Sequence, residues 1–219
     1  MTTKLAIYGA GGFGRETSVM IEQINNQTPT WDVIGFFDDG FQKGQEVDGL
    51  RILGDINDLN SYPSDLAICI AIADPVVRFK LIKKITNLKI KYPLIIHPLA
   101  IVGDSKRNRL GRGSIVTAGV ILTTGIDVGE FCIINLSSTI GHDVKLGKCC
   151  TIMPASSISG NVSIGSGCVL GTGSRIIQGV TIGESCMIGA GSVVTKSFGN
   201  NLKILGIPAR KRVSHVEGV

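Results

Sequence analysis

Aliphatic residues recur at every sixth position through the second half of this chain. Fifteen positions taken in steps of six are all Ile, Leu or Val. These positions are Leu110, Val116, Leu122, Val128, Ile134, Ile140, Leu146, Ile152, Ile158, Ile164, Leu170, Ile176, Ile182, Ile188 and Val194. A helix repeats every 3.6 residues, and one strand is far shorter than this run. The pattern therefore predicts many short strands joined by tight turns.

A second pattern, with a period of 18, is nested in the first. The residues four places after the aliphatic positions are Cys132, Ser138, Val144, Cys150, Ser156, Val162, Cys168, Ser174, Val180, Cys186 and Ser192. Both periods fit a coil of three strands, each pointing one aliphatic and one smaller residue into a triangular interior. Coils stack at the strand spacing of about 4.8 Å, so residues 18 apart are vertical neighbours. Glycines such as Gly129 and Gly147 stand at corners where a side chain would crowd the chain.

The first half of the chain alternates between strand and helix patterns. We expect strands over 4–8, 33–37, 66–72 and 93–96, and helices over 13–24 and from 75 to about 88. Asp74 before Pro75 is a typical helix cap. This order predicts a small parallel α/β domain over residues 1–97, followed by the β-helix over 98–219. Residues 103–108 break the six-residue spacing, as a loop inserted in the first coil would.

A glycine-rich loop joins the first expected strand to the first helix. It consists of Gly9, Ala10, Gly11, Gly12, Phe13 and Gly14. Its backbone N–H groups and the helix N-terminus can face a pyrophosphate. Asp38 and Asp39 follow the second strand, where a carboxylate meets a ribose in dinucleotide sites. NAD is the usual ligand, but the sheet is short and no domain for hydride transfer follows. A nucleotide carried by a sugar satisfies the same residues.

The composition argues against nucleic-acid-binding, membrane and metal-binding proteins. The net charge is only +5, and 5% of residues are aromatic. The basic residues are not interleaved with aromatic ones, so nucleic-acid binding is not expected. There is no signal-peptide pattern and no apolar stretch long enough for a membrane, which predicts a cytoplasmic protein without membrane contact. The six cysteines lack metal-ligand spacing, so no metal is expected. Four of them form one inward column, Cys69 is expected in the core, and Cys149 takes an outward position.

His142 is the histidine that falls within the coils, and the pattern points it outward. An imidazole can accept a proton from an amine or hydroxyl at neutral pH, and the adjacent Asp143 can orient it. Gly160 lies 18 residues later, so its backbone N–H is expected beside His142, where it can stabilise an oxyanion. The alternative is an ordinary solvated histidine.

Several motifs together resemble one family across nearly the whole chain. They are YGAGGFGRE, FFDDG, IAIADPVVR, IIHP, the hexads with IGHD, SGNVSIG and the closing GIPARKR. The chain resembles the bacterial nucleotide-amino-sugar N-acetyltransferases, grouped with sialic acid O-acetyltransferase-like proteins. The resemblance implies a Rossmann-like N-terminal domain and a left-handed β-helix of hexapeptide repeats. It also implies that His142 and Asp143 perform base catalysis.

The resemblance further assigns ligands to residues. It implies that the nucleotide of a UDP-amino-sugar is bound by Gly9 to Gly14, Asp38, Asp39, Ala73, Asp74 and Arg78. It implies that acetyl-CoA lies between adjacent subunits of a homotrimer, touching Thr151, Gly160, Thr172, Ala190, Gly206, Ile207, Pro208, Ala209 and Arg210. Many relatives have His at the positions of Thr151 and Phe13, so this chain departs from them there.

The expected reaction is direct transfer of an acetyl group from acetyl-CoA to the amino group of a nucleotide-linked sugar, such as a UDP-4-amino sugar, for bacterial surface-glycan biosynthesis. Three alternatives stay open on the sequence. O-acetylation of a sialic-acid-type sugar uses the same base. An NAD-dependent oxidoreductase is favoured by the glycine loop alone. A metal-binding β-helix of the carbonic anhydrase kind needs several histidines on neighbouring coils, whereas these coils contain one.

Overall fold

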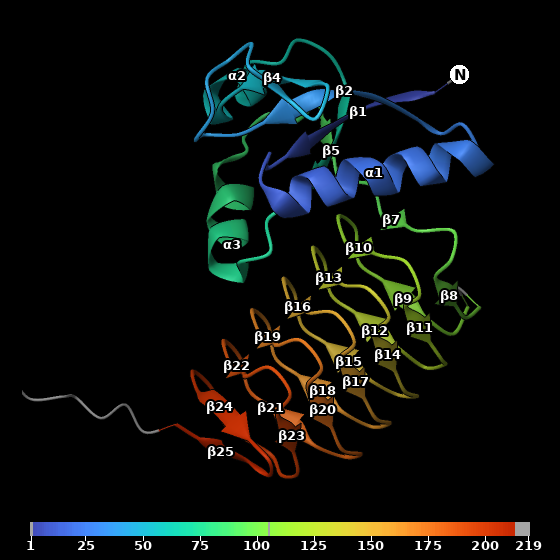
Figure 1. The fold of residues 1–219 in the computed structure, drawn as a ribbon, viewed down its shortest axis with the longest axis vertical. Coiled ribbons are helices and arrows are strands. Elements are labelled where there is room, and N and C mark those ends of the chain that lie inside the picture. The colour runs from blue at the N-terminus through green and yellow to red at the C-terminus, as the bar shows by residue number, and fades with distance from the viewer. Residues whose placement is uncertain (1, 105, 213–219) are drawn as a thin grey trace, which may run out of the picture.

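Two parts are stacked in the computed structural model, which describes residues 2–104 and 106–212 (Figure 1). An α/β unit covers the first coils of a long parallel β-helix. The coils then run away from that unit toward the C-terminal strands at the opposite end. The two-part organisation predicted from the change in periodicity is therefore present.

The α/β unit is one six-stranded sheet with three helices. Its elements are β1 (Thr3–Tyr8), α1 (Gly12–Gln27), β2 (Trp31–Phe37), β3 (Glu46–Val47), β4 (Leu50–Gly54), α2 (Ile56–Asn60), β5 (Leu66–Ile70), α3 (Pro75–Lys84) and β6 (Ile90–Lys91). The strand order is β3-β4-β2-β1-β5-β6, and only β3 and β4 pair antiparallel. Every residue of β5 is buried, which explains its continuous apolar sequence.

Some boundaries differ from the expectation. Helix α3, the second of the two expected helices, ends at Lys84 rather than near Leu88. Strand β5 ends at Ile70 rather than Ile72. The short elements β3, β4, α2 and β6 were not predicted, because two to five residues carry little periodic signal. The strand expected over 93–96 is β7, which pairs with β10 and so belongs to the β-helix rather than to the α/β sheet.

Three sheets form the walls of the β-helix. Face 1 contains β7 (Ile95–Ile96), β10 (Ile115–Val116), β13 (Ile133–Ile134), β16 (Thr151–Ile152), β19 (Val169–Leu170), β22 (Met187–Ile188), β24 (Lys203–Gly206) and β25 (Ala209–Lys211). Face 2 contains β8 (Ile101–Val102), β11 (Ile121–Leu122), β14 (Thr139–Ile140), β17 (Ser157–Ile158), β20 (Arg175–Ile176) and β23 (Val193–Val194). Face 3 contains β9 (Arg109–Leu110), β12 (Asp127–Val128), β15 (Lys145–Leu146), β18 (Ser163–Ile164) and β21 (Thr181–Ile182). We name the corner between faces 1 and 2 corner A, between faces 2 and 3 corner B, and between faces 3 and 1 corner C.

The strand register confirms the 18-residue period. Asp127 pairs with Lys145, and Lys145 pairs with Ser163. In the first coil Ile95 pairs with Ile115, a spacing of 115 − 95 = 20, whereas Arg109 and Asp127 are again 18 apart. The two additional residues therefore fall between β8 and β9, where the broken spacing predicted an inserted loop.

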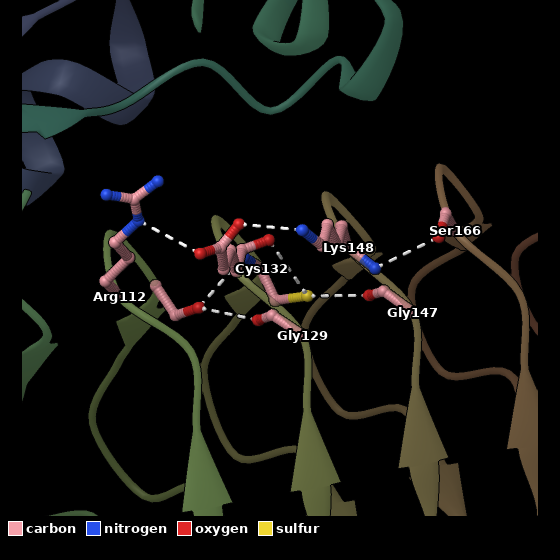
Figure 2. Close-up of polar contacts among 8 residues, drawn as sticks. Arg112, Gly129, Cys132, Gly147, Lys148 and Ser166 are labelled. Atoms are coloured by element: carbon pink, nitrogen blue, oxygen red, sulfur yellow. Dashed lines mark hydrogen bonds and ion pairs between the residues drawn. The ribbon is translucent and has the colours of Figure 1, made fainter.

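The inward columns are buried as predicted, and the small polar members have a further task. The Cys132 thiol donates to the Gly147 carbonyl of the next coil at 3.1 Å (Figure 2). The Ser138 hydroxyl donates to the Met153 carbonyl at 3.1 Å in the same way. Cysteine and serine can alternate in the columns because both supply a donor to a carbonyl that would otherwise be buried without one. All six cysteines are free and buried, which confirms core roles for Cys69 and the inward column.

Charged residues on corner C also stack from coil to coil, as Figure 2 shows. The Arg112 side chain donates to Glu130 at 3.0 Å, and the Lys148 ammonium donates to the other Glu130 oxygen at 2.9 Å. The hydrogen bond from Lys148 helps to lower the pKa of Glu130. These exposed pairs contribute little to stability individually, and they neutralise one another along the corner.

The coil glycines serve close packing between coils. A Cβ added at Gly165 would lie 2.6 Å from the Glu184 backbone nitrogen of the next coil. The left-handed backbone falls two residues later along each corner, at positions such as Asp143 with φ 57° and Gly191 with φ 65°.

We therefore expect Gly165→Ala to destabilise the β-helix although alanine is small. Backbone atoms cannot move aside without separating two coils, so the cost should reach about 2–3 kcal/mol, as for overpacked cores. Thermal unfolding should show a midpoint lowered by roughly 4–12 °C. Gly191→Asn is the matched control, because that site is open and Asn tolerates its φ. Equal midpoints for the two variants would contradict this account of stacking.

The α/β unit packs against face 1. The outward residues Ile115 and Ile133 share an apolar cluster with Met20 and Ile21 of α1. Cys149 points outward from corner C, as predicted, yet it is buried because the α/β unit covers it. The sequence pattern alone did not indicate that cover.

Candidate active site

His142 lies at corner B, directly after β14, and its imidazole is half-exposed. Nδ1 lies 2.9 Å from Oδ2 of Asp143. Asp143 adopts the left-handed backbone of the corner, which turns its carboxylate alongside the ring. A carboxylate that accepts a hydrogen bond from Nδ1–H leaves the lone pair of Nε2 free to take a proton. The outward imidazole and its acidic neighbour are therefore arranged as the sequence predicted.

Gly160 lies beside the imidazole on the next coil. The Asn161 N–H donates to the His142 carbonyl at 2.8 Å, and a Cβ added at Gly160 would lie 2.5 Å from Cε1 of His142. The space that a side chain would need is thus occupied by the ring. The Gly160 N–H donates to no acceptor within residues 2–104 and 106–212, so it is available to an oxygen beside His142. The predicted neighbourhood is confirmed, and the oxyanion role stays a prediction.

The glycine loop has the close packing that its sequence requires. Gly9 has φ 105°, and a Cβ added at Gly14 would overlap the Gly9 carbonyl. The Ala10 N–H donates to Asp38 at 2.8 Å, which ties the loop to the end of β2. Helix α1 begins at Gly12 with no side-chain cap, so its first N–H groups are free to meet an anion.

The acidic pair is partly engaged within the fold. Asp38 accepts from the N–H groups of Ala10 and Gly40, both at 2.8 Å. Asp39 accepts from the Tyr8 hydroxyl at 2.6 Å. Burial, with Asp39 adding to it, raises the pKa of Tyr8. Both carboxylates are at the carboxyl edge of the sheet, where ligands of such folds bind, and their contact with a ribose stays a prediction.

Other residues predicted to bind the nucleotide lie at the same edge but differ in access. Asp74 caps α3 as expected, accepting from the Val76 N–H at 2.7 Å. Ala73, just before it, uses its carbonyl to accept from Thr151 at 2.6 Å. Arg78 and Thr151 are each only 1% exposed. In the single chain these two side chains are closed to a ligand, unlike the open sites that nucleotide and cofactor contact require.

A cavity of about 470 Å³ opens between α1 and corner A. Its wall from α1 includes Gly12 and Phe13, and its wall from the coils includes Thr117, Asn135 and Leu136. The Asn135 carboxamide oxygen accepts from the Leu136 N–H at 2.8 Å, and its Nδ2 has no acceptor in the described chain. A cavity of this size suits a small ligand. Sequence reasoning missed Asn135, although it is a polar residue at a position where glycine often follows the aliphatic one.

Apart from Thr151, buried on face 1, and Gly160, on corner B, the predicted cofactor residues lie along corner A and at the end of the β-helix. Thr172 and Ala190 are exposed on corner A, two and three coils beyond Leu136. Strands β24 and β25 form a hairpin whose turn exposes Ile207, and Gly206 N–H donates to Ser192 at 3.1 Å. The remaining tail positions differ: Pro208 and Arg210 are exposed, whereas Ala209 is buried in the coil core.

The structure separates these groups into two places. His142, Asp143 and Gly160 lie on corner B, whereas the cavity, Thr172 and Ala190 lie on corner A. Strand β14 of face 2 spans the distance between Leu136 and His142 within a single coil. One chain alone therefore does not bring the base to the cavity, and a second copy placing its corner B against corner A would do so.

Neither a metal centre nor a membrane-spanning element is found in the part that the structure describes. Its residues hold no group of three or more Cys, His, Asp or Glu side chains placed to bind an ion. None of its helices combines the length and apolar character of a transmembrane segment. His97, the other histidine of the described residues, is buried, and its Nε2 lies 2.7 Å from Oε1 of Gln23. Burial lowers the pKa of His97.

The chain matches two family models and one characterised relative. Residues 4–85 match the family model described as PglD N-terminal domain, and residues 143–178 and 161–196 match that of the bacterial transferase hexapeptide. GDP-perosamine N-acetyltransferase of Escherichia coli is 31% identical over 139 residues, which are 64% of this chain and 62% of that protein. The matched stretch thus spans less than two thirds of that relative.

Solved structures match over nearly the full length. PerB from Caulobacter crescentus, in complex with CoA and GDP-perosamine, is 33% identical with a TM-score of 0.84, covering 97% of this chain and 99% of that one. The acetyltransferase domain of PglB from Neisseria gonorrhoeae, in complex with acetyl coenzyme A, is 30% identical with a TM-score of 0.86, covering 97% and 100%. The expected fold class, an α/β domain followed by a left-handed parallel β-helix, is confirmed. The chain belongs to the hexapeptide-repeat family of nucleotide-amino-sugar N-acetyltransferases.

Proposed function

We propose that this chain transfers the acetyl group of acetyl-CoA to the amino group of a nucleotide-linked sugar, with His142 as the general base. The observation that carries the proposal is the cluster at corner B. There an outward imidazole has its Nδ1 beside a carboxylate and its ring beside the Gly160 amide. The family membership supplies the class of reaction, and the relatives that hold CoA or acetyl coenzyme A support the acetyl donor.

The reaction needs no covalent intermediate on the enzyme. The sugar amine attacks the thioester carbonyl carbon while Nε2 of His142 takes a proton from the amine. The carbonyl oxygen becomes an oxyanion that accepts a hydrogen bond from the Gly160 N–H. When the C–S bond breaks, His142 returns the proton to the sulfur of CoA. The products are the N-acetylated sugar and CoA, and the imidazole is neutral again.

The nucleotide-linked sugar fits the carboxyl edge of the sheet and the adjoining cavity. The free N–H groups at the start of α1 favour the diphosphate, and Asp38 or Asp39 faces the ribose. The sugar then enters the cavity, where the Asn135 amide is a donor for one of its oxygens. We propose a UDP-linked 4-amino sugar of surface-glycan synthesis as the acceptor. A Caulobacter relative holds GDP-perosamine instead, so both nucleotides are tested below.

Acetyl-CoA is proposed to lie along corner A, over Thr172 and Ala190 and toward the Gly206 to Arg210 hairpin. This path leads to the cavity on the same corner. The base must then come from corner B of a neighbouring copy, which favours a homotrimer with three equivalent shared sites. The separation of His142 from the cavity by one face of the prism is the geometric reason for sharing.

Product analysis tests the proposed reaction. The protein is incubated with acetyl-CoA and either a UDP- or a GDP-linked 4-amino sugar, and the sugar product is examined by mass spectrometry. We expect a mass gain of one acetyl group that survives mild alkali, as an amide does. The matched controls are the same nucleotide sugars with a hydroxyl in place of the amine. Equal acetylation of these controls would show O-acetylation, and no gain on any amino sugar would refute the proposal.

A further inference from the structure

Arg78 is the side chain on which the contact between the two parts of the chain converges. It projects from α3 and is 1% exposed. One terminal nitrogen, Nη1, donates to the carbonyls of Ile72 and Ala73, the latter at 3.2 Å. The other, Nη2, donates to the Cys149 carbonyl at 2.8 Å and the Cys150 carbonyl at 3.2 Å. A single guanidinium therefore joins the end of β5 to corner C.

Thr151 completes this link. Its hydroxyl accepts from Nη2 of Arg78 at 3.0 Å and donates to the Ala73 carbonyl at 2.6 Å. Thr151 begins β16 on face 1, and it follows Ile115 and Ile133 in the same outward column. Those two residues meet α1 through apolar contact, whereas Thr151 meets the α/β unit through hydrogen bonds.

Joining the two surfaces through a buried guanidinium costs free energy. All its acceptors are neutral, and no carboxylate pairs with Arg78 among the described residues. The Arg78 Nε is buried with no partner there either. Burying a cation without an anion costs more than packing an apolar chain of the same volume. What the guanidinium adds is direction, because its planar fork fixes the angle and distance of the groups it binds.

Each segment that Arg78 joins leads to one part of the proposed reaction site. Ile72 and Ala73 continue β5 beside the glycine loop, where the Ala71 N–H donates to the Tyr8 carbonyl and a Cβ added at Gly9 would lie 2.9 Å from the Ala71 oxygen. Cys149 to Thr151 lead into β16, whose far end reaches corner A. Corner A carries the proposed acetyl-CoA contacts, and the sheet edge carries the proposed nucleotide contacts.

We propose that Arg78, together with Thr151, is a positioning residue that fixes the nucleotide-binding edge on the β-helix and so sets the distance between the sugar amine and the thioester carbon. The proposal rests on the proposed function. It replaces the direct ligand contacts that the family resemblance implied for these two side chains. Nucleophilic attack requires the reacting atoms in near contact, and a misplacement of about 1 Å can cost on the order of 100-fold in rate.

The test compares Arg78→Met, Arg78→Lys and Thr151→Val with the wild type, and Arg51→Met serves as the matched control because Arg51 is an exposed arginine of β4. We expect Arg78→Met to lower kcat by about 10- to 100-fold. The affinities for UDP or GDP and for CoA, measured by calorimetry, should change less than twofold. Thr151→Val should lower kcat in the same direction by a smaller factor, and Arg78→Lys should recover part of the rate. The double variant should be no slower than Arg78→Met alone, because both changes break one link.

Other results would overturn the proposal. A tenfold loss of nucleotide affinity in Arg78→Met would assign Arg78 to ligand contact. An unchanged kcat in folded Arg78→Met and Thr151→Val would show that the link only supports packing. If Arg78→Met does not fold, Thr151→Val and Arg78→Lys carry the same comparison.

Amide hydrogen exchange separates this proposal from the proposed function. We expect faster exchange in peptides covering 70–74 and 148–152 of the Arg78 and Thr151 variants, with the other coils unchanged. That readout needs no substrate, so it holds or fails even if the wild type acetylates no amino sugar. Unchanged exchange in both peptides would show that Arg78 and Thr151 do not hold these two segments together.

Discussion

Replacing His142 with Asn is expected to lower kcat for acetyl transfer by about 100- to 10,000-fold, the range for loss of a general base. Asparagine has a similar size and keeps an outward polar side chain at the half-exposed corner, but it cannot accept the amine proton. Folding and binding of both substrates should therefore be preserved. The measurement is release of CoA in the presence of the amino-sugar acceptor, with substrate affinities determined separately.

Thr124→Ala provides the control for His142→Asn, since Thr124 occupies the same corner position one coil earlier. Its kcat should stay within twofold of the wild type. Wild-type kcat in His142→Asn would show that proton transfer does not depend on this residue. If the loss of activity in His142→Asn comes with a lowered thermal unfolding midpoint, the residue has a structural role instead.

The second large effect is expected at Gly160. Gly160→Ala should lower kcat by about 100-fold or more, the scale for losing an oxyanion donor. The added methyl group competes with the imidazole for the same space, so the ring is displaced and the amide is covered together. The measurement is rapid quench followed by chromatography, which should show that bound acetyl-CoA is consumed slowly.

Gln178→Ala, one coil after Gly160 on the same corner, is the matched control and should be active. The double variant His142→Asn with Gly160→Ala should be only slightly slower than His142→Asn, because residues that act as one unit are not additive. Full activity in Gly160→Ala would contradict the geometry, since it would mean that neither the ring position nor the amide matters.

Much of this site was predictable because the β-helix is periodic. Once residues 18 apart were placed as vertical neighbours, the sequence put Gly160 next to His142 without any further information. The same counting placed Cys132 and Cys150 inside, and it located the inserted loop of the first coil. Repetition converts a sequence spacing directly into a spatial one, which few other folds allow.

The docking of the α/β unit was not predictable in the same way. It depends on contacts between segments more than 70 residues apart, such as Arg78 with Cys149, for which no period exists. One signal was available: Ile115 and Ile133 occupy outward positions, and aliphatic residues there indicate a covered face. Following that column one coil further would have placed Thr151 under the same cover. The cavity at Asn135 arises from the same docking and was missed for the same reason.

The shared site is the central claim, and mixed assemblies test it most directly. A His142→Asn chain and a Gly12→Trp chain, whose added side chain enters the cavity from an open position, are each expected to be inactive. Co-expressed with different affinity tags and purified through both tags, they should regain roughly one third of wild-type activity, because each mixed trimer pairs an intact cavity with an intact base at one of its three shared sites. Mixed assemblies as inactive as their parents would show that base and cavity do not meet across copies.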